Sequence, residues 1–215
     1  MENSLQETYR YHHGTFRREG LAIFKDLRGE YLRARIGEGK RVLDIGCRDG
    51  ALTLTYAKGN EVVAADIDSV ALKALEGIMG IKTMQMDLNG TWELPAHSFD
   101  VVVAAEVLEH LYYPGRVLER ITGVLKNDGM LIGSVPNAFS LKNRIRLLFG
   151  RKHNTPLADP THINHFSRAE LTALFKEYFQ KVEIVPVGRY AFLENIFPGL
   201  FSFMMLFCVK NPKQI

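Results

Sequence analysis

The sequence has little of what marks secreted, zinc-binding or membrane-spanning proteins. Its two cysteines, Cys47 and Cys208, lie far apart and form no metal-type pair. So few cysteines favour a reduced setting inside the cell. The longest nearly unbroken apolar run, 200–209, is shorter than the ~20 residues that a membrane helix needs. Residues 1–14 lack the apolar segment of a secretory signal, so we expect a cytoplasmic protein.

A strong charge of either sign is also missing. The formal net charge is +3, which is too small to favour nucleic acid as a partner, so we do not expect such binding. We find no internal repeat and no low-complexity segment. Hydrophobic residues make up 47% and charged residues 24% of the 215 residues, which indicates a folded protein large enough to bury a core.

Strand-like and helix-like segments alternate through much of the chain. Short apolar runs typical of buried strands occupy 41–46, 61–66, 82–87, 99–106 and 129–136. Helical patterns separate or precede them at 16–36, 51–59, 69–80 and 115–126. This alternation predicts βαβ units, and therefore an α/β fold around a parallel sheet.

The C-terminal part adds one more helix and two more strands. Ser167 and Glu170 have the spacing of a capping box, which predicts a helix over 167–179. Two further strands are expected at 181–187 and 202–211. The segment between them is expected to form a short helix or a loop.

The stretch VLDIGCRDG, residues 42–50, has the pattern of a strand that runs into a glycine loop. In an open α/β sheet, ligands bind beyond the carboxyl ends of the strands, where the strand order reverses. The loop is not G-x-G-x-x-G, so a dinucleotide site and a nicotinamide oxidoreductase are disfavoured. Asp44 stands before the glycines and would repel a pyrophosphate. It favours an adenosine that carries an amino acid and a sulfonium.

Two more acids stand at the ends of the next two predicted strands. Asp66 lies twenty residues after Gly46, a position from which a carboxylate accepts hydrogen bonds from ribose hydroxyls. Asp87 ends the third strand, where it can accept from an adenine amino group. A single acid at a strand end is most often a turn or cap residue. Acids at the ends of three successive strands, beside a glycine loop, indicate a nucleoside site.

Residues 42–136 resemble a class I S-adenosylmethionine-dependent methyltransferase. The resemblance rests on VLDIGCRDG, VVAADID, MDL, SFDVVVAAEVLEHL and LKNDGMLIGSVPN. HINHFSRAEL extends it to the branch of the ubiquinone O-methyltransferase-like enzymes and the type 11 and type 23 methyltransferases. It implies a Rossmann-like seven-stranded sheet, mostly parallel with the last strand antiparallel, and helices on both faces. It also implies S-adenosylmethionine as cofactor and S-adenosylhomocysteine as product.

The resemblance assigns cofactor contacts residue by residue. They are Asp44, Gly46, Cys47 and Gly50 at the methionine part, Asp66 at the ribose, Ile67, Asp87 and Leu88 at the adenine, and Ala105 and Glu106 near the methionine amino group or sulfonium. Arg48 stands where the family usually has the middle glycine of the loop. We expect Arg48 to have an ordinary negative φ and to point to solvent. The alternative is that its guanidinium binds the cofactor carboxylate.

One domain with four parts accounts for these patterns. We interpret residues 1–38 as an N-terminal helical extension and residues 39–136 as the cofactor-binding core. Residues 137–168 form a lid or insertion, and residues 169–215 form a C-terminal helix with strands.

Histidines supply the candidate catalytic residues. Methyl transfer from a sulfonium is an in-line displacement, and a base helps a hydroxyl acceptor to lose its proton. The candidates for this base are His110, His162 and His165, of which we favour His110 and His162. If the turn after the fourth strand is helical, Glu106, Glu109 and His110 share a face. With His162 or His165 they could bind magnesium or manganese, as in the quinone and small-RNA methyltransferases with an E-x-x-E-H motif. We favour capping and loop ordering over a metal.

We therefore expect a methyltransferase that acts on a hydroxyl of a small, sugar or lipid-like molecule. The alternatives are an RNA 2′-hydroxyl methyltransferase with an E-x-x-E-H metal site and a non-catalytic S-adenosylmethionine-binding protein. The basic segment 140–154 and the phenylalanine-rich segment 192–205 leave peripheral membrane contact open, although a solvated face and a packed strand are the simpler interpretation. The sequence fits a monomer or a homodimer.

Overall fold

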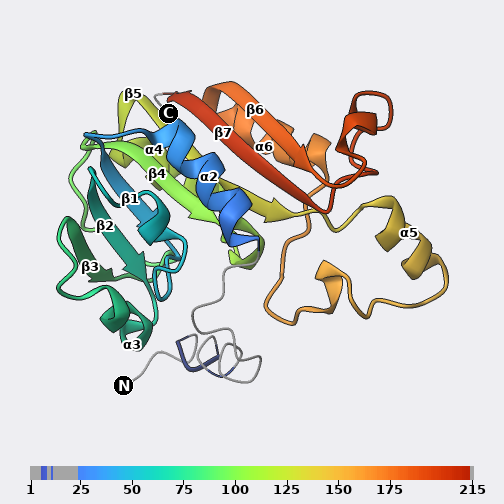
Figure 1. Cartoon of the computed structure of the whole chain (residues 1–215), viewed down its shortest axis with the longest axis horizontal. Coiled ribbons are helices and arrows are strands. Elements are labelled where there is room, and N and C mark those ends of the chain that lie inside the picture. Colours follow the sequence, from blue (N-terminus) through green and yellow to red (C-terminus); the bar gives the residue numbers. More distant parts are fainter. Residues whose placement is uncertain (1–5, 9–10, 12–23, 214–215) are drawn as a thin grey trace.

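The computed structural model describes residues 6–8, 11 and 24–213, and its centre is a single seven-stranded sheet (Figure 1). The strand order is β3-β2-β1-β4-β5-β7-β6. The strands are β1 (Arg41–Ile45), β2 (Glu61–Asp66), β3 (Ile81–Gln85), β4 (Phe99–Ala105), β5 (Leu125–Pro136), β6 (Phe179–Val187) and β7 (Met204–Pro212). The predicted seven-stranded α/β fold is confirmed.

The direction of the strands fixes where a ligand can bind. Strands β3, β2, β1, β4 and β5 pair in parallel, whereas β7 pairs antiparallel with both β5 and β6. The order runs outward in one direction from β1 through β2 and β3, and in the other direction through β4 and β5. The carboxyl end of β1 is therefore the switch point of the sheet, and the glycine loop follows it directly.

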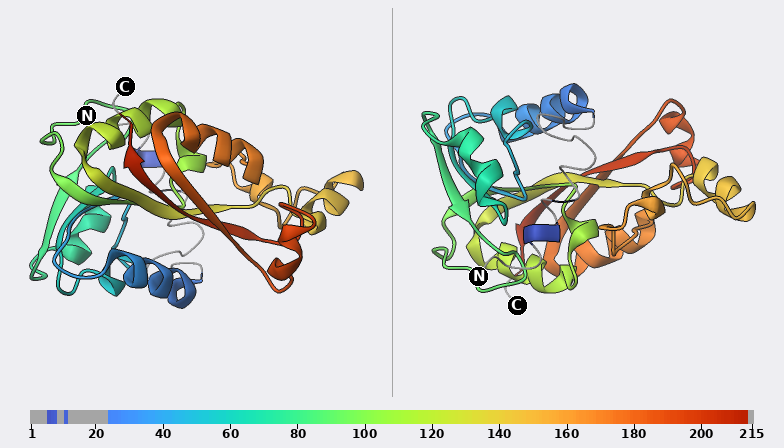
Figure 2. Two further views of the ribbon diagram at one scale, coloured as in Figure 1. Left: turned by 90° about the horizontal axis from the view of Figure 1, so that it is seen from above. Right: turned by 90° about the horizontal axis from the view of Figure 1, so that it is seen from below.

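Helices cover both faces of the sheet (Figure 2). On one face, α2 (Lys25–Ile36) packs Leu32 and Ile36 against Val42 and Val103 of the central strands. On the other face lie α4 (Pro114–Val124) and α6 (Arg168–Tyr178), which contribute to the larger of the two apolar clusters. Because both faces are covered, the central strands are apolar along almost their whole length, as their sequence indicates.

Two of the predicted helices are much shorter than their sequence patterns suggest. In 51–59 only a 3₁₀ turn forms, η1 (Thr53–Thr55), because the two threonine hydroxyls bond to Asp44 and to the Leu52 carbonyl. The helix predicted over 69–80 ends after α3 (Ser69–Leu72) and η2 (Lys73–Leu75). Gly77 and Gly80, both with left-handed φ, follow it and prevent its continuation.

The C-terminal predictions hold more closely. Both bonds of the capping box between Ser167 and Glu170 are present at the start of α6. The insertion contains α5 (Leu141–Leu148) and η4 (Pro156–Ala158), and the segment before β7 contains η5 (Ala191–Asn195). A further 3₁₀ element, η3 (Leu108–His110), follows β4. Within the described ranges, none of the helices is both long enough and apolar enough to pass through a bilayer.

Candidate active site

A cavity of about 710 Å³ opens beyond the carboxyl ends of β1, β2 and β4. Most of the predicted site residues line it, namely Asp44, Gly46, Cys47, Asp66, Ile67, Asp87, Leu88, Ala105, Glu106, His110 and His162. Of the predicted cofactor residues, only Gly50 lies outside the lining. The topology thus brings residues from five separate stretches of sequence to one edge of the sheet.

Asp44 ends β1 and lies buried at the base of the cavity. The hydroxyls of Thr53 and Tyr56 both donate to its Oδ2, at 2.6 and 2.5 Å. Burial raises the pKa of Asp44 to about 6, although these hydroxyls partly counteract the rise. Asp44 thereby fixes the fold of the loop and adds an acidic group to the cavity.

The two glycines of the loop are required by space as well as by backbone conformation. Gly46 has φ 68° and Gly50 has φ 73°. A Cβ on Gly46 would lie 2.7 Å from Val107 Cγ2, and one on Gly50 would lie 2.1 Å from Leu75 Cδ2. Gly50 therefore allows the loop to pack closely against Leu75, on the side away from the cavity. Cys47 lies between the two glycines, and burial raises the pKa of its thiol well above the ordinary value, which disfavours the thiolate form.

The acid that ends β2 organises the loop above it. Asp66 accepts the backbone N–H of Arg48 through Oδ2 and that of Asp68 through Oδ1, both at 2.8 Å. It is half-buried and lines the cavity. Burial raises the pKa of Asp66, and the two amide bonds partly counteract this.

The expectation that Arg48 has a negative φ and points to solvent is wrong. Its φ is 52°, and its side chain is only 17% exposed. The guanidinium lies in the cavity lining, where Nη2 is 3.7 Å from Asp49 Oδ2. Arg48 adopts a left-handed conformation, and its own N–H donates to Asp66, which holds the backbone there.

The ends of β2 and β3 provide apolar walls next to acids. Ile67, Met86 and Leu88 line the cavity together with Asp87, whose Oδ1 accepts the Asn89 N–H at 2.9 Å. Apolar surfaces beside carboxylate acceptors suit a flat heterocycle with polar edges.

At the end of β4, an acid lies close to a cation that the sequence patterns did not reveal. Glu106 has a left-handed φ of 61° and accepts the hydroxyl of Ser134 at 2.9 Å. Burial raises the pKa of Glu106, and the charge of Arg28 lowers it. Arg28 is buried on α2 and lines the cavity. It was missed because a basic residue in an amphipathic helix has no local signal of function.

A cluster of one acid and two imidazoles follows directly. Glu109, His110 and His162 each offer one ligand atom, and these three atoms lie within 4.8 Å of one another. Glu109 is buried, and neither of its carboxylate oxygens has a hydrogen-bond partner among the described residues. Burial raises the pKa of Glu109 well above its usual range, and the neighbouring Glu106 raises it further.

This grouping agrees only in part with the predicted one, which also included Glu106 and allowed either His162 or His165. The helical turn begins only at Leu108, so Glu106, Glu109 and His110 do not share one face. Glu106 and His165 lie outside the three-residue group, although the His162 and His165 rings are 6.5 Å apart. His162 joins the cluster because the 161–164 segment is held against η3.

Backbone bonds attach this part of the predicted lid to the end of β4. The carbonyl of Glu109 accepts the N–H groups of Ile163 and Asn164, both at 2.9 Å. The Nδ1 of His110 lies 2.9 Å from the Thr161 carbonyl oxygen. The His110 and His162 rings meet edge to face at 4.8 Å. The lid therefore brings His162 to the cavity, which sequence spacing alone could not establish.

Comparisons with known proteins identify the family of this chain. The family model described as "Methyltransferase domain" matches residues 15–182, more than three quarters of the chain. The ubiquinone biosynthesis O-methyltransferase of Nitrosococcus oceani is 38% identical over 118 residues, which are 52% of this chain and 50% of that protein. The chain spans about half the length of the curated relatives that it matches.

Solved structures share the fold at low sequence identity. The Burkholderia thailandensis 1,6-didemethyltoxoflavin-N1-methyltransferase, solved with 1,6-didemethyltoxoflavin and S-adenosylhomocysteine, has a TM-score of 0.71 and 17% identity, covering 97% of this chain and 88% of that one. A SAM-dependent methyltransferase from Archaeoglobus fulgidus has a TM-score of 0.66 and 22% identity, covering 92% and 99%.

Proposed function

Since the chain belongs to the methyltransferase family matched over residues 15–182 and its cofactor is S-adenosylmethionine, we propose that it methylates a hydroxyl of a small, sugar or lipid-like molecule. One observation supports this most directly. The cavity that is lined by Asp66 and Asp87, the acids expected to bind the nucleoside, is also lined by His110 and His162. The Nitrosococcus relative, named an O-methyltransferase, supports oxygen as the acceptor atom.

The residues around the cavity fit this cofactor. We assign Asp66 and Asp87 to its hydroxyl and amino groups, and Ile67 and Leu88 to the faces of its ring, because carboxylates accept and aliphatic side chains pack. When bound, S-adenosylmethionine supplies a methyl group on a positively charged sulfur, which an acceptor oxygen can attack in line.

The amino acid end of the cofactor also finds matching charges. Glu106 is an acceptor for its amino group, and the Arg28 guanidinium is a donor for its carboxylate. Both residues line the cavity, and the charge of Arg28 lowers the pKa of Glu106. Asp44, Gly46, Cys47 and Gly50 shape the loop that surrounds this end.

We assign the base to His110, on the basis of its tautomer. Its Nδ1 lies against the Thr161 carbonyl, which can only accept, so Nδ1 has the hydrogen, and in the neutral imidazole Nε2 then has the lone pair. That lone pair can take the proton of an acceptor hydroxyl. His162 packs edge-on to the His110 ring, and its own Nε2 lies 3.8 Å from Asp159 Oδ2. We therefore assign His162 to positioning the His110 ring.

A second candidate is a metal-assisted version of the same transfer. Glu109, His110 and His162 provide one oxygen and two nitrogens, and the buried carboxylate of Glu109 lacks a hydrogen-bond partner among the described residues. This donor set fits manganese or another divalent cation. A divalent cation held by these residues would supply a positive charge that lowers the pKa of a nearby hydroxyl.

The test is a methyl-transfer screen with labelled S-adenosylmethionine against hydroxylated quinones, sugars, lipids and RNA. We expect transfer to a hydroxyl compound, with a rate reduced ~100-fold in His110→Ala. His97→Ala is the matched control, because His97 also bonds through Nδ1 to a carbonyl but is absent from the cavity lining. Transfer only to RNA would favour the RNA alternative. Lack of S-adenosylhomocysteine binding in calorimetry would refute the enzyme proposal.

Exhaustive chelation separates the two mechanisms. If a metal is required, activity disappears on chelation, returns with added Mn²⁺ or Mg²⁺, and is not restored in Glu109→Gln. If activity survives chelation, the base mechanism alone is correct.

A further inference from the structure

Two segments extend together beyond one end of the sheet, and we call them the arm: residues 140–153, which include α5, and residues 189–203, which include η5 (Figures 1 and 2). On α5, Leu141, Ile145 and Leu148 form a stripe at helical spacing, and all three are exposed. Leu148 is 81% exposed. An amphipathic helix normally buries such a stripe, so this one faces away from the core.

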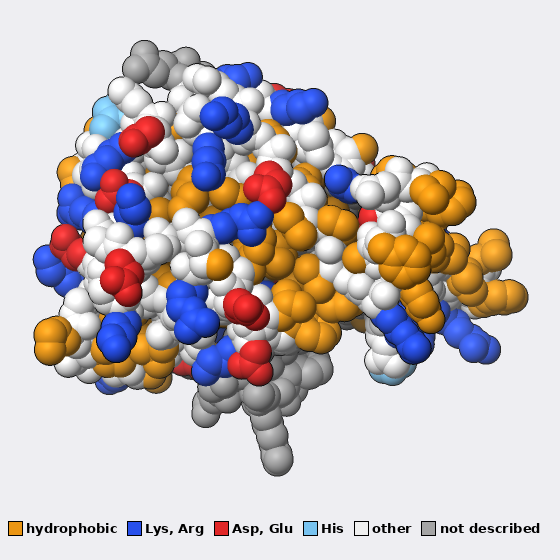
Figure 3. Space-filling model, turned by 45° about the horizontal axis from the view of Figure 1, so that its top comes forward, with side chains coloured by type: hydrophobic (Ala, Val, Ile, Leu, Met, Phe, Trp, Pro, Cys, Tyr) orange, Lys and Arg blue, Asp and Glu red, His pale blue; other side chains and the backbone are white. Residues whose placement is uncertain are grey.

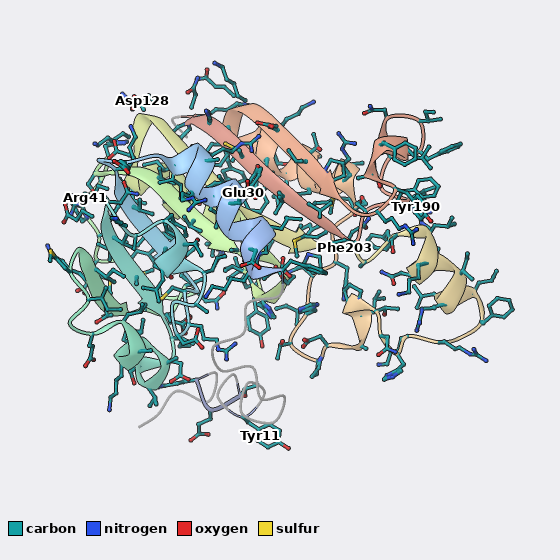
Figure 4. All side chains as sticks on the ribbon, in the orientation of Figure 1. Tyr11, Glu30, Arg41, Asp128, Tyr190 and Phe203 are labelled. Atoms are coloured by element: carbon teal, nitrogen blue, oxygen red, sulfur yellow. The ribbon has the colours of Figure 1, made fainter. Side chains whose placement is uncertain are left out.

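The second segment displays apolar side chains next to the first. Phe192 is 71% exposed and Ile196 is 69% exposed, and Phe197 is also exposed. Tyr190 and Phe203, labelled in Figure 4, lie directly before η5 and directly before β7, respectively. In Figure 3, hydrophobic side chains gather on this protruding end with Lys and Arg beside them. The arm therefore presents an apolar surface formed by two separate segments.

Buried polar bonds hold these side chains in place. The carboxylate of buried Glu194 accepts the backbone N–H groups of Gly199, Phe201 and Ser202. Asn137, also buried, donates to the carbonyl oxygens of Gly199 and Ser202, and the Leu141 N–H donates to the Leu200 carbonyl at 2.8 Å. The apolar side chains are thus displayed on an ordered scaffold.

The charges of the arm are of one sign. Its basic residues are Lys142, Arg144, Arg146, Arg151, Lys152 and Arg189. Its only acid is Glu194, which is buried and accepts three backbone N–H groups within the arm. Like charges of this density would repel a second copy of the same surface, whereas each Lys or Arg is attracted to anionic headgroups.

We propose that the arm docks the protein on the surface of an anionic lipid bilayer. Its apolar side chains enter the boundary between headgroups and acyl chains, and its basic residues contact the lipid phosphates. The apolar surface of the arm continues to the cavity. Phe203 and Phe24 are both exposed and line the cavity, and their ring centroids lie 4.5 Å apart. Docking would therefore bring the cavity close to lipid-dissolved molecules. The docking itself does not depend on which acceptor the enzyme uses.

The test is flotation of the full chain with vesicles of phosphatidylcholine alone and of phosphatidylcholine mixed with phosphatidylglycerol. We expect binding to the anionic vesicles only, weakened when salt rises from about 0.1 M to about 0.5 M. Leu148→Asp and Phe192→Asp should each lower the partition coefficient roughly tenfold, and Lys142→Glu with Lys152→Glu should do the same. None of these four residues lines the cavity, so binding of S-adenosylhomocysteine should be unchanged and reports that the variants fold.

Met79→Asp is the matched control, because Met79 is 95% exposed but lies in the turn before β3, outside the arm. It should leave vesicle binding unchanged. Equal binding to neutral and anionic vesicles, or an equal loss in Met79→Asp, would overturn the proposal. A wild-type dimer in light scattering that Leu148→Asp dissociates would overturn it too, because the occupant would then be a second copy.

Discussion

At the scale of single residues, the left-handed position in the glycine loop is the most unusual feature. Arg48 adopts φ 52° where a glycine would be unstrained, and this conformation costs a non-glycine residue roughly 1–2 kcal/mol. The N–H of Arg48 is held by Asp66 and its guanidinium is near Asp49. The residue is therefore retained in a strained conformation at the edge of the cofactor cavity.

The strain predicts the effect of two substitutions at this position. Arg48→Gly should raise the free energy of unfolding by about 1 kcal/mol, because glycine adopts this φ without a Cβ penalty. Arg48→Ala should not, since alanine keeps the penalty and loses the side chain. Urea denaturation of both variants measures the difference, and equal stabilities would contradict the strain argument.

Asp66 provides the corresponding test of cofactor assignment. Asp66→Ala should weaken S-adenosylhomocysteine binding at least ~tenfold, because the carboxylate offers acceptors to the cavity and also positions the loop. Calorimetry measures the dissociation constant. Asp100→Ala, which removes an acid near the start of β4 outside the cavity lining, is the control. Unchanged affinity in Asp66→Ala would refute the ribose assignment.

At the scale of secondary structure, local signals succeeded where the backbone itself provides the bonds. The capping box at α6 formed as predicted, because Ser167 and Glu170 satisfy each other's backbone N–H groups within one turn. The helix expected at 51–59 did not form. Instead, the Thr53 hydroxyl donates to Asp44, and this bond holds the segment in a single 3₁₀ turn. A short-range pattern cannot contain that distant carboxylate.

Removal of the cap should have a defined cost. Ser167→Ala should lower the free energy of unfolding by about 1 kcal/mol, since the N–H of Glu170 loses its acceptor. Thr172→Ala on the same helix is the control, because its hydroxyl bonds only to the Arg168 carbonyl, which is already part of the helix. Equal losses in the two variants, measured by thermal or urea unfolding, would argue against the cap.

At the scale of the whole molecule, the fold gathers several acids that burial disfavours in their charged form. Burial raises the pKa values of Asp44, Asp66, Glu106 and Glu109, all near one edge of the sheet. An acid with a raised pKa in the folded state stabilises that state only while it is protonated. The site is therefore a source of instability that increases with pH.

The consequence is a pH dependence to which Asp44 should contribute in a defined range. Its pKa rises from 3.8 to about 6, so the stability that it adds is complete below about pH 4 and is lost as pH rises through about 6. The loss should be roughly 2–3 kcal/mol. Asp44→Asn keeps an acceptor for Thr53 and Tyr56 and should flatten this part of the curve. Denaturation of both proteins between about pH 4.5 and pH 7.5 tests it; parallel curves would contradict it.

The sequence by itself determined the alternation of strands and helices that makes the core of the sheet parallel, and it predicted the edge of the sheet at which a ligand would bind. Asp44, Asp66 and Asp87 end three buried strands, and parallel strands must place their carboxyl ends at one edge. Alternating apolar segments and glycine positions are local properties, so a single sequence reveals them.

Only the tertiary structure decided which distant side chains share the cavity. It placed Arg28 of α2 near Glu106, brought His162 of the insertion to Glu109 and His110, and turned Arg48 away from solvent. It also joined α5 to the η5 loop in one exposed surface. These results depend on contacts across the sheet between segments far apart in the chain, and such contacts leave no periodic or spacing signal in the sequence.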